Sequence, residues 1–421
     1  MEKLMLPPFD YKPTPYEGLI FDGKMQYVFD EKGERYLDCI AGICTVSVGH
    51  SHPKIIKAAK DQYDKIQHIT NIYLHPNIVE YSEKLASKFP GNLKVCYFCN
   101  SGSEANEFAM QLARSYTGQF DIIALRNAYH GMGAAMDLTA NAAWKQPTPH
   151  GFGIHHALLP DTYRGPFNGE DAGEKYAQDV EDLIGTSTCG KVAGFICEPI
   201  QGVGGVIEYP PDYLKRVYEI VRKHGGLCIA DEVQTGFGRT GDNYWGFQNY
   251  GVIPDIVTMA KGIGNGAPLA AVVTTPEIAQ SITKKHHFNT FGGNPISMAI
   301  GKAVLEVIDE ENIQEKAKEV GGYLHSELEK MREKHKLIGK IRGRGLMCGI
   351  DLVEDQKTKK PATTQAGEVM EKLKDLKVLI GKGGLFGNIL RIKPPMCITK
   401  PDINYFIKAL DVVLDSVEKK I

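Results

Sequence analysis

The chain has 421 residues, 43% of them hydrophobic, so it can bury a large core and exceeds one ordinary domain. Its formal net charge of −2 gives no electrostatic footprint for nucleic acid or a membrane surface. No apolar run approaches the roughly 18 residues that a membrane span requires. Residues 1–8 lack a signal-peptide core and an Arg/Ser-rich presequence, which predicts an intracellular protein of the cytoplasm or the mitochondrial matrix.

The first 52 residues hold short alternating segments separated by turns, which predicts an N-terminal segment of small strands that joins the smaller lobe. Helices are expected at 53–67 and 76–89, each opened by a proline suited to a first helical turn. Strands and helices then alternate. The expected strands are 95–99, 121–125, 192–197, 227–230, 256–260 and 269–275. This alternation predicts an α/β domain at 53–300 with a largely parallel, doubly wound sheet.

The proline- and glycine-rich segment 144–174 is expected to be a long loop that walls a functional site, because such loops in compact domains are usually functional. A change in composition near residue 300 then predicts a smaller α+β domain at 301–421. Its expected elements are a long charged helix at 297–336, a strand at 341–352, a helix at 363–377, an extended segment at 378–392 and a final helix at 401–419.

No metal site is predicted. The nine cysteines are scattered, and most lie inside apolar runs, where a reduced thiol packs as a small hydrophobe. Cys96 and Cys99 form a C-x-x-C, but strand positions three apart face opposite ways, so a shared metal or disulfide is not expected. The two histidines of 49–53 have no second cluster of ligand spacing to accompany them.

Two apolar runs end in oppositely charged residues, Asp231 and Lys261. Because each run reads as a buried strand, both side chains are expected at the ligand crevice of the sheet. A lysine with a neutral amine can form an imine with an aldehyde, and pyridoxal phosphate (PLP) is the obvious one. Its ring nitrogen stays protonated beside a carboxylate, an attraction of roughly 4 kcal/mol at ~4 Å and an effective dielectric of ~20. We interpret Lys261 as the imine former and Asp231 as that carboxylate.

Residues 100–107 offer a cradle for a phosphate. They follow the strand at 95–99 and open a helix, so free backbone N–H groups and the helix dipole point at one spot. Gly102 allows close approach, and Ser103 adds a hydroxyl. Taken alone, the segment is more often an ordinary serine capping box.

Residues 231–241 read Asp-Glu-Val-Gln-Thr-Gly-Phe-Gly-Arg-Thr-Gly, and 260–262 read Ala-Lys-Gly. Together they closely resemble the signature of the class III aminotransferases, which are PLP enzymes of fold type I. The resemblance runs from about Gly23 to the C-terminus and is nearest to the alanine–glyoxylate branch. It implies a large domain with a mostly parallel seven-stranded sheet, a smaller α+β domain and PLP as the cofactor.

The resemblance also assigns cofactor contacts. Gly102 and Ser103 would bind the phosphate, and Tyr129 and Val233 would cover the two faces of the ring. Gln234 would hydrogen-bond the phenolic oxygen.

Two further residues are expected at the site. Glu198 ends a strand and would be an orienting carboxylate of the cofactor site. Thr290 matches a threonine that in relatives reaches the phosphate of the neighbouring subunit. The resemblance therefore implies a homodimer with active sites at the interface, and it allows a tetramer.

Arg391 resembles the carboxylate-binding arginine of the family, and its planar fork suits bidentate recognition. Ornithine aminotransferase has a masking glutamate where this chain has Val203, and a tyrosine where it has Ile43. We therefore predict a small amino donor such as alanine, a small oxo acid acceptor such as glyoxylate or pyruvate, and ping-pong kinetics. A PLP-dependent phospho-lyase and an omega-amino-acid aminotransferase on the same fold stay open as alternatives.

Overall fold

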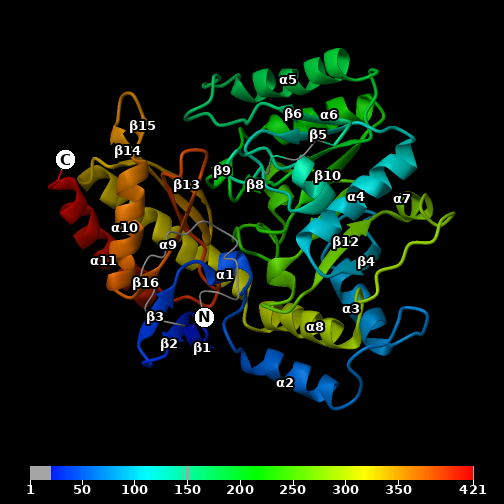
Figure 1. Ribbon diagram of the computed structural model, residues 1–421, viewed down its shortest axis with the longest axis horizontal. Coiled ribbons are helices and arrows are strands. Elements are labelled where there is room, and N and C mark those ends of the chain that lie inside the picture. Colours follow the sequence, from blue (N-terminus) through cyan, green and yellow to red (C-terminus); the bar gives the residue numbers. More distant parts are fainter. Residues whose placement is uncertain (1–19, 146, 148–150, 421) are drawn as a thin grey trace.

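The computed structural model describes residues 20–145, 147 and 151–420, and it shows two lobes side by side (Figure 1). The prediction about a presequence depended on residues 1–8, which lie outside the described residues. Within the described ranges, no helix is long and apolar enough to cross a membrane.

A seven-stranded sheet forms the centre of the larger lobe, with the order β4-β12-β11-β10-β7-β5-β6. Its strands are β4 (Val95–Cys99), β5 (Ile122–Leu125), β6 (Ile154–Ala157), β7 (Gly194–Cys197), β10 (Leu227–Asp231), β11 (Ile256–Met259) and β12 (Ala270–Thr274). Strand β12 is antiparallel to both of its neighbours, and the other neighbouring pairs are parallel. The predicted largely parallel sheet is therefore confirmed.

Both faces of this sheet are covered. Alternate residues of a strand point to opposite faces, and each set packs in a different hydrophobic core. Ile122 and Ala124 of β5 pack in the core that contains α4 (Gly102–Thr117), whereas Ile123 and Leu125 pack in the larger core. The other helices of this lobe are α2 (Pro53–Tyr63), α3 (Pro76–Ala86), α5 (Ala172–Ser187), α6 (Tyr213–Lys223), α7 (Pro276–Gln280) and α8 (Pro295–Glu310).

The expectation of one continuous loop at 144–174 is wrong. Edge strand β6 lies inside this segment and pairs in parallel with β5, and α5 begins before its end. Two of the four residues of β6, His155 and His156, are polar, so no apolar run marks the strand. An edge position tolerates them, and His155 Nε2 lies 2.9 Å from Asp121 Oδ1 at the protein surface.

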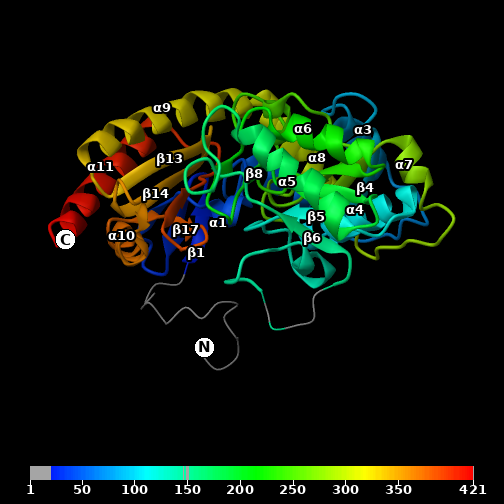
Figure 2. The same ribbon diagram turned by 90° about the horizontal axis from the view of Figure 1, so that it is seen from above.

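The smaller lobe contains the sheet β13-β14-β18-β17 and three long helices. Its elements are α9 (Ile313–Lys334), β13 (Ile338–Arg344), β14 (Met347–Asp355), β15 (Lys360–Pro361), α10 (Thr363–Asp375), β17 (Gly381–Gly383), β18 (Ile389–Ile392) and α11 (Lys400–Glu418). Helices α9 and α10 lie on opposite sides of β13 and β14 (Figure 2).

The N-terminal strands belong spatially to this lobe. They are β1 (Ile20–Lys24), β2 (Tyr27–Asp30) and β3 (Arg35–Asp38), and β3 pairs in parallel with β16 (Val378–Leu379). Backbone hydrogen bonds from Leu37 and Cys39 to Lys377 and Leu379 accompany this pairing.

Two predicted elements of the C-terminal part are each divided in two. The expected helix at 297–336 breaks between α8 and α9 at Asn312, which has a left-handed φ of 51° that asparagine tolerates. The expected strand at 341–352 is the β13–β14 hairpin, which turns at Gly345 with φ 54°. The helix break depends on the single residue Asn312, whereas two glycines of positive φ, Gly343 and Gly345, lie at the hairpin turn.

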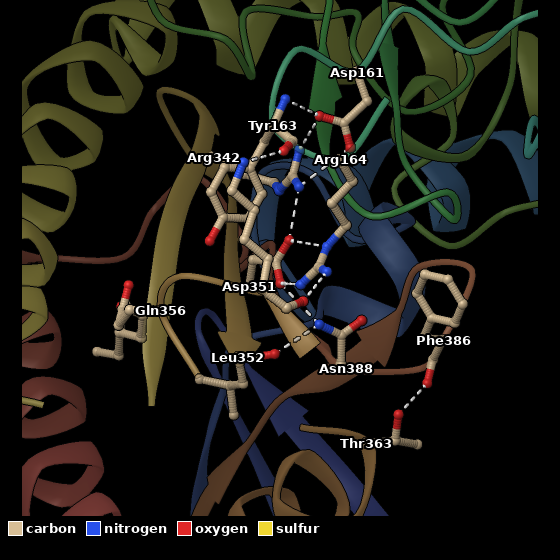
Figure 3. A network of polar contacts seen from close by, with 12 residues as sticks. Asp161, Tyr163, Arg164, Arg342, Asp351, Leu352, Gln356, Thr363, Phe386 and Asn388 are labelled. Atoms are coloured by element: carbon tan, nitrogen blue, oxygen red, sulfur yellow. Dashed lines mark hydrogen bonds and ion pairs between the residues drawn. The ribbon is translucent and has the colours of Figure 1, made fainter. Parts of the chain in front are cut away.

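An ion-pair network joins the two lobes (Figure 3). Asp161 and Arg164 come from the segment after β6, and Arg342 and Asp351 come from β13 and β14. Arg342 lies 2.7 Å from Asp351 and 3.2 Å from Asp161. Arg164 donates through Nε to Asp351 at 3.1 Å, and Asn388 donates to Asp351 at 2.8 Å. The fully buried carboxylate of Asp351 is thus paired from both lobes.

Candidate active site

A cavity of about 340 Å³ lies where the carboxyl edge of the large sheet faces the smaller lobe. The sequence-predicted residues that line it are Ile43, Gly102, Ser103, Tyr129, Glu198, Asp231, Val233, Gln234, Lys261 and Arg391. Residues far apart in the chain, from the N-terminal segment and from both lobes, therefore meet at one cavity. Of the predicted site residues, Thr290 alone does not line it.

Asp231 is the last residue of β10 and is held by hydrogen bonds on both carboxylate oxygens. Its Oδ1 accepts from the backbone N–H of Val233 at 3.1 Å. Its Oδ2 accepts from Asn106 Nδ2 at 2.9 Å and lies 2.7 Å from His130 Nδ1. Thr258, opposite Asp231 on β11, donates to Asn106 Oδ1 at 2.7 Å. The carboxylate is buried and its orientation is fixed by its neighbours.

Lys261 follows β11 at the same edge of the sheet, and its side chain lines the cavity. Burial lowers the pKa of this amine, and the charge of Arg391 acts in the same direction. A larger fraction of the amine is therefore neutral near pH 7 than for an exposed lysine. Its backbone has a left-handed φ of 51°, a conformation that costs a non-glycine residue roughly 1–2 kcal/mol.

The first turn of α4 points into the cavity. Ser101 caps the helix by accepting from the N–H of Glu104 at 3.2 Å, so this serine also serves as an ordinary N-cap. The N–H groups of Gly102 and Ser103 have no acceptor within the helix, because the first turn of any helix lacks one. A Cβ at Gly102 would lie 3.2 Å from a methyl group of Val233. Gly102 thus keeps the backbone accessible from the cavity, as an anion site requires.

Glu198 and Tyr129 are connected to each other. Glu198 accepts from the backbone N–H of Tyr129 at 3.1 Å and from that of Gly202 at 2.7 Å. Burial raises the pKa of this carboxyl above its ordinary value. The ring of Tyr129 makes an edge contact with Trp144, with centroids 5.0 Å apart. Glu198 therefore orders the loop that carries Tyr129 into the cavity.

Gln234 and Arg391 meet at the opposite wall. Arg391 lies on β18, and its Nη2 is 3.4 Å from Gln234 Oε1. Lys393, two residues further along, donates to the same oxygen at 2.8 Å. Lys393 is fully buried, and burial together with the charge of Arg391 lowers its pKa well below the ordinary value.

Ile43 lies on α1 (Ala41–Cys44), a single turn placed between the two lobes (Figure 1). The four residues of this turn have φ values of 55°, 56°, 65° and 63°, so the turn is left-handed. Such a turn is costly for L-residues. Its effect is to direct Ile43, 43% exposed, to the cavity.

Glu232 points away from Asp231, as alternation along a strand requires. Its buried carboxyl accepts from Thr235 Oγ1 at 2.6 Å and from the backbone N–H groups of Gly246 and Phe247 at 2.9 Å and 2.7 Å. Burial raises the pKa of Glu232 to about 7. This residue orders the loop after β10 that carries Val233 and Gln234.

Thr290 is exposed and lies outside the cavity of its own chain. Its neighbour Asn289 is fixed near the start of α4, because it accepts from Asn100 at 3.0 Å and donates to Glu104 at 2.9 Å. The segment that carries Thr290 is therefore ordered, although Thr290 itself faces solvent.

The histidines and cysteines described in the structure form no metal site near this cavity. His50 pairs with Asp38 and His52 with Glu311. Among the described residues, the one group with suitable ligand spacing is His335, Asp415 and Glu418, on the smaller lobe. The nine cysteines are free, and six of them are buried.

Sequence reasoning missed Asn106, His130 and Lys393. All three stand in segments that carry a predicted residue, next to or near Ser103, Tyr129 and Arg391. Lys393 had a usable signal, since residues two apart on a strand share a face and Arg391 was expected to face the site. The contacts of Asn106 and His130 with Asp231 span more than 100 residues and had no signal.

The sheet, its crevice and the lysine–carboxylate pair define a PLP-dependent enzyme of fold type I. The family model for class III aminotransferases matches residues 14–414, so the chain belongs to this family. The chain is 52% identical to alanine–glyoxylate aminotransferase 2 homolog 2, mitochondrial, of Arabidopsis thaliana, over 96% of this chain and 90% of that protein. It is 46% identical to human alanine–glyoxylate aminotransferase 2, mitochondrial, over 93% and 80% of the two chains.

Among solved structures, an Arthrobacter phospholyase in complex with phosphoethanolamine matches with a TM-score of 0.91 and 33% identity, over 98% of this chain and 97% of that one. The comparisons confirm the predicted fold, the class III assignment and PLP as the cofactor. The residues present fit this cofactor. One end of the cavity presents helix N–H groups suited to a phosphate, and its walls present an oriented carboxylate and a buried amine.

Proposed function

We propose that the chain transfers an amino group from a small amino acid, such as alanine, to a small oxo acid, glyoxylate or pyruvate, by a ping-pong mechanism. One observation carries the proposal: a single cavity brings Lys261 and Asp231 together with the N-terminus of α4 and with Arg391. The names of the two curated relatives, both alanine–glyoxylate aminotransferases, support these substrates.

The cavity residues have separate parts in holding the cofactor. Gly102 and Ser103 would bind the phosphate through their N–H groups. Tyr129 and Val233 would flank the ring, and Gln234 would donate to its phenolic oxygen. When bound, PLP supplies a ring that withdraws electrons from the substrate carbon while its nitrogen is protonated.

Asp231 and Lys261 would carry the chemistry. Asp231 holds the proton at the ring nitrogen, and Asn106 and His130 keep its carboxylate in place. In each half-reaction the amine of Lys261 would carry a proton between the α-carbon of the substrate and C4′ of the cofactor. A positioned base of this kind typically contributes 10²–10⁴-fold to the rate. Glu198 would orient the loop of Tyr129 without taking the proton.

Arg391 would bind the substrate carboxylate through two parallel hydrogen bonds. Val203 and Ile43 line the same cavity and give it apolar walls. A small side chain such as that of alanine leaves no polar group unpaired against these walls, whereas the second amine of ornithine would.

We further propose a homodimer with active sites at the interface, from which a tetramer can be built. Thr290 faces solvent, close to an apolar patch formed by Ile72, Tyr73, Leu74 and Phe291, whose exposures are 77%, 64%, 90% and 63%. The ring of His68 contacts Phe291, so the two segments of the patch adjoin. An exposed apolar patch of this kind marks an interaction surface, and from it Thr290 would reach the phosphate of the neighbouring subunit.

We also propose limits for the domains of the chain and a compartment of the cell in which it lies. The domain limits are 1–52 for the N-terminal segment, 53–300 for the PLP-binding domain and 301–421 for the smaller domain. Both curated relatives are named as mitochondrial, which supports the mitochondrial matrix over the cytoplasm.

The test is a panel of amino donors, each assayed with glyoxylate and with pyruvate. We expect alanine with glyoxylate to be turned over faster than ornithine or 4-aminobutyrate, with parallel lines in double-reciprocal plots. Faster turnover of ornithine or 4-aminobutyrate would contradict the proposed specificity.

A phospho-lyase is the second candidate, because the Arthrobacter relative was solved with phosphoethanolamine. Release of phosphate from phosphoethanolamine without any oxo acid would establish the lyase activity instead. An aminotransferase loses turnover when the oxo acid is left out.

A further inference from the structure

Lys393 is a fully buried lysine that the proposed chemistry does not use. It follows β18 directly, two residues after Arg391, and has 0% exposure. It does not line the cavity. Burial of an amine is costly unless the amine is hydrogen-bonded. The role of Lys393 is therefore sought in the hydrogen bond that its amine makes.

The amine of Lys393 donates to Gln234 Oε1 at 2.8 Å. The other nitrogen near this oxygen, Arg391 Nη2, is more distant at 3.4 Å. Both are donors, so a flipped amide would place its NH₂ group against two N–H groups. The contacts therefore fix the carbonyl oxygen of Gln234 on the side of Lys393.

The remaining faces of the amide are also determined. Gly202 packs directly on it, since a Cβ there would lie 2.4 Å from Oε1 and 2.5 Å from Cδ of Gln234. Gln234 lines the cavity, and its Nε2 has no hydrogen-bond acceptor among the residues that the structure describes. The NH₂ group is thus the part of the side chain left to interact with a bound molecule.

We propose that Lys393 is a positioning residue that holds the amide of Gln234 so that its NH₂ group donates to an oxygen of the bound cofactor. The inference rests on the proposed function, which gives Gln234 a contact with the phenolic oxygen. Lys393 acts only through Gln234, because no atom of Lys393 reaches the cavity wall.

Two neutral variants of similar length separate the hydrogen bond from the charge. Lys393→Gln keeps an N–H donor, whereas Lys393→Met removes it. We expect Lys393→Met to weaken retention of PLP by the holoenzyme about 10-fold, the scale of one lost hydrogen bond, and Lys393→Gln to weaken it less. Dissociation constants come from equilibrium dialysis with absorbance detection, and thermal melting checks folding. Lys408→Met, at an exposed position of α11, is the matched control.

A double-mutant cycle with Gln234→Leu decides the matter. If Lys393 acts through Gln234, Lys393→Met has no further effect on PLP affinity in the Gln234→Leu background. Equal effects in both backgrounds, or wild-type affinity and spectrum in Lys393→Met, would overturn the proposal. Should Lys393→Met be recovered unfolded, Lys393→Leu, which also lacks an N–H donor, gives the same cycle with Gln234→Leu. Cofactor affinity is read without turnover, so failure of the substrate proposal leaves this test intact.

Discussion

At the scale of single residues, the cavity is organised by buried polar groups whose partners are specified. Asp231 is held by three neighbours, and its strand neighbour Glu232 is held by three others on the opposite side. Adjacent acids of one strand thus serve two tasks, since successive side chains face opposite ways. One is placed at the cavity and one fixes the loop that follows.

Lys261→Ala should abolish transamination, with kcat lower by at least about 10²–10⁴-fold, because no other lysine of the described ranges lines the cavity. Borohydride treatment should tie PLP to Lys261 in the wild type and leave the variant unlabelled by mass spectrometry. Lys408→Met is the control. Retained turnover in Lys261→Ala would contradict the assigned role.

Glu232 should make stability depend on pH. Burial raises its pKa to about 7 from an ordinary value of 4.5, so the folded protein holds this proton more tightly than the unfolded chain. The free energy of unfolding contributed by Glu232 should therefore fall as pH rises from about 4.5 to about 7. Glu232→Gln cannot titrate, and urea unfolding should show its stability approaching or passing that of the wild type across this range. Parallel pH profiles would refute the assignment.

At the scale of elements, the left-handed turn α1 places Ile43 at the cavity, and backbone strain there has a measurable cost. Gly42 has φ 56°, and a Cβ at this position would have space, with Thr45 Cβ at 3.9 Å. Gly42→Ala should still destabilise the protein by about 1 kcal/mol, because the left-handed region disfavours any Cβ.

The control for Gly42→Ala is the same substitution in an ordinary helix. Gly322 lies in the middle of α9, and a methyl group added there would meet no described atom within 4 Å, so Gly322→Ala should stabilise the protein by about 1 kcal/mol. Denaturant titration measures both. A stabilising effect of Gly42→Ala would show that the turn carries no strain.

At the scale of the whole molecule, the network of Figure 3 couples the two lobes that together form the cavity. Asp351→Asn would leave Arg164 and Arg342 without their shared carboxylate, and we expect a loss of about 3–5 kcal/mol in stability. Glu333→Gln, an exposed change on the same lobe, is the control and should be nearly neutral. Unchanged melting of Asp351→Asn would show that the network does not stabilise the arrangement of the lobes.

The apolar patch gives a prediction about assembly. Leu74→Asp places a charge at a side chain that is 90% exposed in the single chain, so a monomer should tolerate it. If the patch is a dimer interface, the variant should elute as a monomer in size-exclusion chromatography and lose PLP and activity on dilution. An unchanged dimer would exclude this surface.

Most of this fold follows from local patterns, but part of the site does not. Buried apolar runs mark the central strands, and proline and serine mark helix starts, so β7, β10 and α4 were predictable. Strand β6 and the break at Asn312 were not, because an edge strand tolerates polar residues and a single backbone angle leaves little trace in composition. The bond between Lys393 and Gln234 joins residues 159 apart, which no local pattern specifies.

Thr290 lies outside the cavity of its own chain. If it completes the site of a second chain, two different inactive variants can complement each other in a hybrid dimer. A mixture of Lys261→Ala and Thr290→Ala subunits would then contain hybrids in which one site carries both lesions and the other carries neither. If turnover is recovered in such a mixture but is absent from either variant alone, each active site contains residues from two chains.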